Sequence, residues 1–196
     1  MPAVTPKSEL NPRRGRIQLL LILAATIGPI LLASAMYKWQ FWVPESRSYH
    51  GELLGSGQHR SELGVVVPAD AGQAESRWQL LVTAPEECDA DCQQLVYLAR
   101  QIQIGLGRES SRATHSLASG APLSEAYQSQ LQSEYPQLGR FSLDRQRYAQ
   151  LQKGDPSVQL WIIDPHGNLV LRYDAKANGK NVLSDLRLLL KLSNIG

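Results

Sequence analysis

The chain has 196 residues, of which 43% are hydrophobic and 19% charged, with a formal net charge of +2. This length and balance fit one globular domain with an appendage, and they exclude a multidomain assembly, a collagen-like fibre and a wholly disordered protein. Residues 1–16 carry four basic side chains and one acidic side chain, whereas residues 38–196 are nearly neutral, so the body lacks the dense positive face that nucleic-acid binding requires.

The first predicted element is a membrane-spanning helix over residues 17–37. This run, IQLLLILAATIGPILLASAMY, carries no charge, and at 1.5 Å rise per residue it spans roughly 30 Å, the thickness of a bilayer core. It is followed by the aromatic residues of an interfacial belt, Tyr37, Trp39, Phe41 and Trp42. The positive-inside rule predicts a single-pass protein of the inner (cytoplasmic) membrane, with residues 1–16 as a cytoplasmic basic tail and residues 38–196 in the periplasm.

A cleaved signal peptide is the alternative for the same segment. The apolar core of a signal peptide is usually about 7–15 residues long and ends in small residues, and Ala33-Ser34-Ala35 offers such a site. The longer apolar run and the aromatic belt favour an uncleaved anchor. Both alternatives place the body in an oxidising compartment, where neighbouring cysteines can form a disulfide.

Residues 38–77 are predicted to form a tether, because they are rich in Gly, Ser, Glu and Arg, with an edge strand or hairpin at the short apolar run 63–67. A domain over residues 78–196 follows. Its first strand is the apolar run 78–83, which ends at Ala84-Pro85. Beyond two cysteines, a helix is predicted from apolar residues three or four apart, at Leu95, Leu98, Ala99, Ile102 and Leu106.

The rest of the domain alternates between strands and helices. These are predicted at 112–118 (strand), 122–135 (helix, with Ser124 as a candidate cap), 141–143 (strand) and 144–152 (helix).

Two further β-rich runs, 157–163 and 169–173, flank the turn formers DPHGN and predict a hairpin, and a last helix is predicted at 181–192. Strands separated by helices imply a parallel section of sheet, to which the hairpin adds an antiparallel edge. The predicted fold class is therefore α/β, a mixed sheet flanked by helices and preceded by one transmembrane helix.

Cys88 and Cys92 lie where the first strand of the domain ends and its first helix begins. The free N–H groups and the positive dipole end of a helix N-terminus favour a thiolate. The flanking carboxylates act in the opposite direction and favour a protonated thiol or a bound cation; they are Glu86, Glu87, Asp89 and Asp91.

The spacing of the two cysteines limits their chemistry. Helical residues four apart have Cβ atoms about 5–6 Å apart, whereas a disulfide needs about 3.5–4.5 Å, so Cys88 is predicted in the loop ahead of the helix. The pair can then form a disulfide or chelate one soft metal ion. A disulfide that closes so small a loop removes little chain entropy, which disfavours a purely structural role. Redox or metal chemistry requires both sulfur atoms in one solvent-reachable pocket.

The strand WQLLVTAP, the C-x-x-x-C sequence at 88–92 with its helix, and the segment SVQLWIIDPHGNLVLRY resemble the Sco/SenC family over about residues 78–192. The resemblance implies a thioredoxin-like fold held outside the membrane by one N-terminal anchor. It also implies a role in assembling the copper centre of cytochrome c oxidase, with Cys88 and Cys92 as the two sulfur ligands of copper or as a redox pair. A respiratory oxidase subunit or a copper-delivery protein would then be the partner.

The chain departs from the Sco/SenC pattern at two places. Family members usually have proline directly after the second cysteine, where this chain has Gln93. They also have a third copper ligand, a histidine about eight residues before the Asp of the hairpin turn, and that count reaches Pro156 and then Ser157. Two thiolates alone can bind Cu(I). The histidines of the chain are interpreted as structural or polar surface residues and not as ligands: His50, His59, His115 and His166.

Three functions remain open at this point. The first is a membrane-anchored, Sco-like factor that delivers copper, or reduces the receiving cysteines, in cytochrome c oxidase assembly. The second is a thiol–disulfide oxidoreductase in which Cys88 attacks and Cys92 resolves the mixed disulfide. The third is a non-catalytic accessory that binds an oxidase subunit. The sequence contains no phosphate-binding G-x-x-x-x-G-K-[ST], no G-x-S-x-G elbow and no H-E-x-x-H motif.

Overall fold

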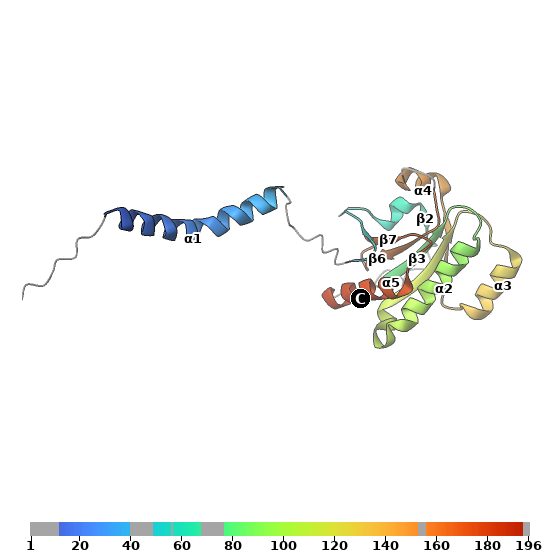
Figure 1. Ribbon diagram of the computed structural model, residues 1–196. Coiled ribbons are helices and arrows are strands. Elements are labelled where there is room, and N and C mark those ends of the chain that lie inside the picture. Colours follow the sequence, from blue (N-terminus) through green and yellow to red (C-terminus); the bar gives the residue numbers. More distant parts are fainter. Residues whose placement is uncertain (1–11, 40–48, 56, 68–76, 153–155, 194–196) are drawn as a thin grey trace, which may run out of the picture. The chain divides into compact units, whose positions relative to one another are not determined.

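The computed structural model describes residues 12–39, 49–55, 57–67, 77–152 and 156–193 (Figure 1). The chain divides into two compact units, Met1–Arg47 and Ser48–Gly196. The described part of the first unit is one helix, and the second unit is a sheet with helices on both faces.

Helix α1 runs over Pro12–Trp39 and includes the predicted membrane segment. Its stretch Gly15–Met36 is long and apolar enough to cross a membrane. Pro29 lies inside the helix without ending it. The hydroxyls of Thr26 and Ser34 donate to carbonyls one turn earlier, because polar groups in an apolar helix need hydrogen-bond partners within the helix itself. The side chains of the predicted aromatic belt at positions 37, 39, 41 and 42 lie outside the described residues.

A seven-stranded mixed sheet forms the centre of the second unit, in the order β1-β7-β6-β3-β4-β5-β2. The central strand β3 is parallel to β4 and antiparallel to β6, β4 is parallel to β5, and β6 forms an antiparallel hairpin with β7. The strands are β1 (Glu52–Leu53), β2 (Val65–Val66), β3 (Trp78–Ala84), β4 (Ala113–Ser119), β5 (Gly139–Leu143), β6 (Gln159–Ile163) and β7 (Leu169–Tyr173).

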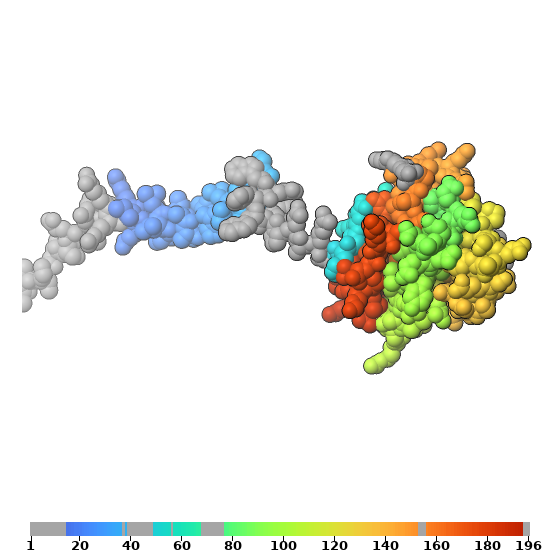
Figure 2. All heavy atoms as spheres, turned by 45° about the vertical axis from the view of Figure 1, so that its right-hand side comes forward, coloured from blue at the N-terminus to red at the C-terminus, as the bar shows by residue number. Residues whose placement is uncertain are grey.

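Helices cover the two faces of the sheet unequally. One face packs against α2 (Ala90–Gly105), α3 (Glu125–Glu134) and α5 (Gly179–Leu192) in the larger core cluster, and Figure 2 shows these three helices side by side. The other face packs against the 3₁₀ helix η1 (Arg60–Leu63) and α4 (Arg145–Gln152) in a smaller cluster. A second 3₁₀ helix, η3 (Gly107–Arg112), joins α2 to β4.

The predicted fold class is confirmed, and the predicted elements from residue 78 onward are present within a few residues of their expected bounds. The run predicted as the first strand is β3, and all of its residues are buried, because it lies in the middle of the sheet with helices on both sides. Ser124 caps α3 as predicted, accepting a hydrogen bond from the Tyr127 N–H at 3.4 Å.

The segment predicted as a tether, residues 38–77, contributes two strands to the sheet, whereas the sequence predicted one edge strand or hairpin at 63–67. β1 pairs with β7 at one edge of the sheet and β2 pairs with β5 at the other. The run 63–67 is divided, because Gly64 adopts a left-handed conformation (φ 75°) that ends η1 before β2 begins. Leu63, fully buried, anchors this turn in the smaller core cluster.

A buried carboxylate fastens the chain just before β1 to the last helix. Asp185 of α5 is 1% exposed. It accepts hydrogen bonds from the His50 N–H at 2.7 Å, from His50 Nδ1 at 2.8 Å, from the Gly51 N–H at 3.1 Å and from the Tyr173 hydroxyl at 2.7 Å. Burial alone would raise the pKa of Asp185, but these hydrogen bonds outweigh burial and hold the pKa below its ordinary value.

This arrangement predicts an acid-sensitive contribution to stability. Because the pKa of Asp185 is lower in the folded chain than in the unfolded chain, its contribution is complete above about pH 4 and is lost as the pH falls through the folded-state pKa. We expect Asp185→Asn to lower the free energy of unfolding by about 2–4 kcal/mol at pH 7, and by less near pH 3.

Denaturant titration of the full chain in detergent at both pH values measures this difference. Glu87→Gln removes an exposed carboxylate outside the helices and should change the free energy of unfolding by less than about 0.5 kcal/mol. Equal losses for Asp185→Asn at pH 7 and pH 3 would show that the ionised form of Asp185 is not what stabilises the fold.

Candidate redox site at the start of helix α2

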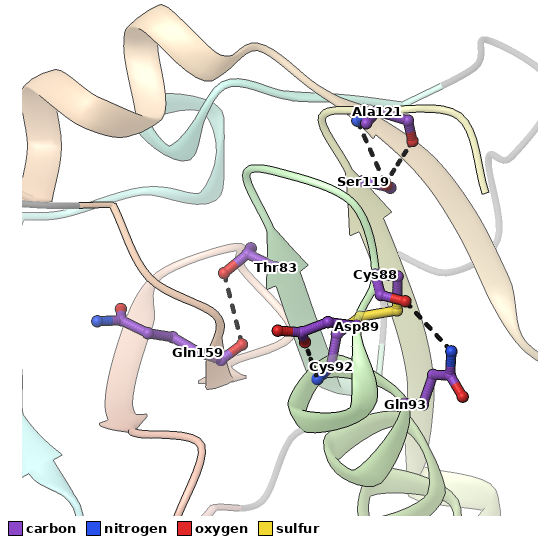
Figure 3. The surroundings of a disulfide bond; sticks show 8 residues. All are labelled: Thr83, Cys88, Asp89, Cys92, Gln93, Ser119, Ala121 and Gln159. Atoms are coloured by element: carbon purple, nitrogen blue, oxygen red, sulfur yellow. Dashed lines mark hydrogen bonds between the residues drawn. A yellow bond between two sulfur atoms is a disulfide. The ribbon is translucent and has the colours of Figure 1, made fainter. Parts of the chain in front are cut away.

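Cys88 and Cys92 form a disulfide between the loop after β3 and the first turn of α2, with their Cα atoms 5.1 Å apart (Figure 3). The helix begins at Ala90, so Cys88 lies outside it and Cys92 lies inside it. This confirms the prediction that Cys88 precedes the helix, which followed from the difference between helical Cβ spacing and disulfide Cβ spacing.

Asp89 determines where the helix begins. Its backbone is extended, and its side chain accepts a hydrogen bond from the Cys92 N–H at 3.0 Å, as an N-cap residue does. Its own N–H donates to the Glu87 carbonyl at 2.9 Å, which makes a tight turn around Cys88. Gln93 closes the loop from the helix side, because its amide donates to the Cys88 carbonyl at 3.2 Å.

The two cysteines differ in exposure. Cys92 is fully buried, whereas Cys88 keeps 6% of its surface exposed. The expectation that both sulfur atoms share a solvent-reachable pocket is therefore wrong, because both cysteines are buried and neither lines a described pocket. Thiol exchange begins at a single sulfur atom, however, so it requires access only to Cys88. The burial of Cys92 follows from helical geometry, since Cys92 begins the buried face that continues through Val96 and Ala99. In the disulfide state, an incoming thiolate can approach this pair only from the side of Cys88.

An acidic cleft of about 440 Å³ opens beside the disulfide loop. Its lining combines residues of this loop with residues before β6 and after β7, namely Pro85, Glu86, Glu87, Asp89, Asp91, Pro156, Ser157, Val158, Asp174, Ala175 and Lys176. Three of the carboxylates have structural partners. Asp89 caps α2, and Glu86 pairs with Arg145 of α4 at 3.0 Å. Asp174 accepts a hydrogen bond from the Lys176 N–H at 2.9 Å. The negative charge predicted from the sequence is thus concentrated in the cleft beside the cysteine loop.

A buried hydroxyl network fixes the opposite wall of the cleft. Tyr148 of α4 donates to the Ser157 carbonyl at 2.9 Å and shares a 2.7 Å hydrogen bond with Thr83, which also accepts from the Trp161 ring nitrogen at 2.9 Å. Burial raises the pKa of Tyr148 to about 12, so its hydroxyl stays protonated. Sequence reasoning missed Tyr148 and Thr83, because nothing in their local patterns shows that they meet.

Gly120 supports the cysteine loop from β4. Its N–H donates to the Ala84 carbonyl at 2.8 Å, and its carbonyl accepts from Arg145 at 3.1 Å. A Cβ at this position would overlap the carbonyl oxygen of Pro85. The loop that carries Cys88 therefore rests directly on the backbone of a glycine.

A family model described as "transmembrane-like, thioredoxin-like, C-terminal domain" matches residues 78–193. A companion model described as "transmembrane-like, N-terminal domain" matches residues 11–40. The chain belongs to this transmembrane-like, thioredoxin-like family. A comparison with curated proteins finds no match.

Solved structures with a similar fold include Sco proteins and thiol:disulfide interchange proteins. ScoI from Arabidopsis thaliana with copper bound is 11% identical, over 60% of this chain and 86% of that protein, with a TM-score of 0.48. ScoI from Bradyrhizobium japonicum with copper bound is 15% identical, over 59% and 86%, with a TM-score of 0.41. A thiol:disulfide interchange protein DsbE from Chlorobium tepidum is 12% identical, over 71% and 99%, with a TM-score of 0.49. Sequence identities and TM-scores this low do not distinguish copper binding from disulfide exchange.

Three of the four histidines lie toward the end of the sheet away from the disulfide. Because β6 is antiparallel to β3, the turn that carries His166 lies near the start of β3, whereas Cys88 follows its end. His59 contacts the His166 carbonyl at 3.1 Å. His115 is paired with Leu80 in the first half of β4 and is hydrogen-bonded to Gln103. Burial, with the nearby charge of Arg100, lowers the pKa of His115 to about 4.

The fourth histidine, His50, is held by Asp185 just before β1. β1 is three strands from β3, or roughly 14 Å at the usual strand spacing. In the described part of the chain, no group of three or more His, Cys, Asp or Glu residues is arranged to hold a metal ion. Pro156 and Ser157, which the sequence count reached in place of a third copper ligand, do line the cleft.

The contact between Gly120 and Pro85 predicts a local effect on the disulfide. We expect Gly120→Ala to push the loop outward, to lower the free energy of unfolding by about 1–3 kcal/mol and to speed reduction of the disulfide by dithiothreitol. Gly105→Ala is the control, because its Cβ would meet only the side chain of Leu183, at 3.1 Å. Equal reduction rates for the two variants would show that Gly120 does not control access to Cys88.

Proposed function

We propose that this protein is a membrane-anchored thiol–disulfide exchange protein whose dithiol or disulfide acts on a partner protein outside the cytoplasm. The observation that supports this most strongly is the unequal burial of the two cysteines at the N-terminus of α2. Cys88 is buried except for 6% of its surface, through which it can form a mixed disulfide, whereas Cys92 is fully buried and can release that intermediate by attacking Cys88.

The reaction balances without a further reagent. In the reducing direction, the Cys88 thiolate attacks a disulfide of the partner, forming one S–S bond and releasing one partner sulfur, which takes a proton. Cys92, after losing its proton, then attacks the sulfur of Cys88. The Cys88–Cys92 disulfide forms, the second partner sulfur leaves as a thiol, and two electrons have passed to the partner. The oxidising direction is the same sequence reversed.

The orientation of the anchor supports an extracytoplasmic site. The basic residues before the apolar run 17–37 favour the cytoplasmic side for the N-terminus, and this orientation supports a periplasmic domain on an inner-membrane protein. The resemblance of the cysteine segment and the hairpin to Sco/SenC proteins supports a respiratory oxidase subunit as the partner. The acidic cleft beside Cys88 favours a partner whose cysteines lie in a basic segment.

This proposal predicts that Cys92→Ser traps a mixed disulfide with the partner, because the attacking sulfur remains and the resolving sulfur is lost. Cys88→Ser should trap little, since Cys92 is buried. Non-reducing gels and mass spectrometry of the full chain isolated from membranes measure both. If neither variant forms a mixed disulfide, and if the double serine variant still supports oxidase assembly, the non-catalytic accessory role is favoured instead.

Copper handling is the second candidate, and the observation that favours it is the close approach of two sulfur atoms beside an acidic cleft. Once reduced, Cys88 and Cys92 fit the two-thiolate coordination of Cu(I). Their thiolates would hold the ion, and the cleft carboxylates would favour its positive charge. The described histidines lie away from this pair, so the residues fit Cu(I) better than Cu(II), which needs a harder nitrogen ligand.

Native mass spectrometry of the reduced full chain in detergent tests this candidate. We expect one equivalent of Cu(I) bound by the wild type, at least tenfold weaker binding by Cys88→Ser, and no comparable binding of Cu(II). His50→Ala should leave Cu(I) binding unchanged, because the His50 side chain is hydrogen-bonded to Asp185 and lies away from the cysteines. A reduced wild-type chain that takes up no Cu(I) would eliminate copper handling and leave thiol exchange intact.

A further inference from the structure

Gln93 connects the helix to the loop that carries Cys88. Its side-chain amide donates to the Cys88 carbonyl at 3.2 Å (Figure 3). Its backbone N–H donates to the Asp89 carbonyl at 2.9 Å. The first turn of α2 and the end of the cysteine loop are therefore joined through one residue. The adjacent Gln94 is equally exposed on the same helix, which makes it a matched reference.

The two cysteines are not held equally once the disulfide opens. Cys92 stays fixed by the helix, by burial and by the hydrogen bond of its N–H to Asp89. Cys88 lies outside the helix, so the loss of the S–S bond removes its covalent link to Cys92. The hydrogen bond from Gln93 then ties the backbone of Cys88 to the helix.

We infer that Gln93 is a positioning residue that keeps Cys88 within closing distance of Cys92 in the dithiol state. This inference rests on the proposed thiol exchange. Holding Cys88 in place raises the effective concentration of one thiol at the other. The disulfide is then more stable against an external dithiol, and attack of Cys92 on a mixed disulfide at Cys88 is faster.

The expected effect follows from the loss of one hydrogen bond. Gln93→Leu keeps a side chain of similar size without a donor. We expect it to lower the equilibrium constant for disulfide formation about fivefold, which for a two-electron couple is a shift of about 20 mV toward a less negative potential. The release of a model mixed disulfide with glutathione at Cys88 should slow by a similar factor.

Redox titration of the full chain in detergent against glutathione buffers measures the equilibrium, with thiols counted by alkylation and mass spectrometry. Gln94→Leu is the matched control and should titrate like the wild type. Gln93→Met, a neutral side chain of similar length that cannot donate, should repeat the shift and serves as the readout if Gln93→Leu does not fold. The unfolding free energy of the oxidised chain, measured alongside, separates a general loss of stability from a change in potential.

A Gln93→Leu variant with wild-type potential and wild-type release rate overturns the inference, and so does an equal shift for Gln94→Leu. Neither result affects the proposed function, which depends on the trapping of a partner by Cys92→Ser. Conversely, a wild-type chain that exchanges with no partner disulfide would end the proposed function. The shift for Gln93→Leu against glutathione would still report on the positioning of Cys88.

Discussion

The start of helix α2 is the constraint on which the site depends. Asp89 caps the helix, so Cys88 is left in the loop while Cys92 becomes the first buried residue of the helix. If the helix began one turn earlier, both cysteines would lie on it with Cβ atoms too far apart to bond. One capping carboxylate therefore determines that the sulfur atoms can meet and that only Cys88 keeps any exposed surface.

The surroundings of the disulfide come from distant parts of the sequence. Gly120 supports the loop from the end of β4, and Arg145 of α4 connects that glycine to Glu86. On the far wall, Tyr148 holds the backbone at Ser157. The short helix α4 thus fixes two walls of the cleft although it contributes none of its lining. A change in α4 packing would therefore reach the cysteine loop through the contacts of Arg145, and the far wall of the cleft through the buried Tyr148.

The sequence predicted those features that repeat along one element. The buried face of α2, the hairpin of β6 and β7 and the loop position of Cys88 follow from residue spacing, and each is present. The burial of Cys92 could also have been predicted from the sequence, because position 92 continues the apolar spacing of Leu95, Val96 and Ala99. What periodicity cannot predict is pairing across many residues. Asp185 binds residues 135 positions earlier in the chain, and its charge gives no local sign of a buried partner.

The difference between local and long-range features also applies to the two proposed chemistries, disulfide exchange and copper binding. Sulfur pairing is a local property, set by four residues of spacing and one cap, and the structure supplies it completely. A nitrogen ligand for copper is a long-range property, because it must arrive from another strand or loop. The position reached by the sequence count does line the cleft, but it holds Pro156 and Ser157, and neither supplies an imidazole. The structure thus brings two sulfur atoms together beside the cleft, and it has no imidazole at the position where the resemblance to Sco/SenC proteins implied one. Such a site can exchange disulfides or hold a soft ion between two thiolates, and both activities depend on how firmly the loop presents Cys88.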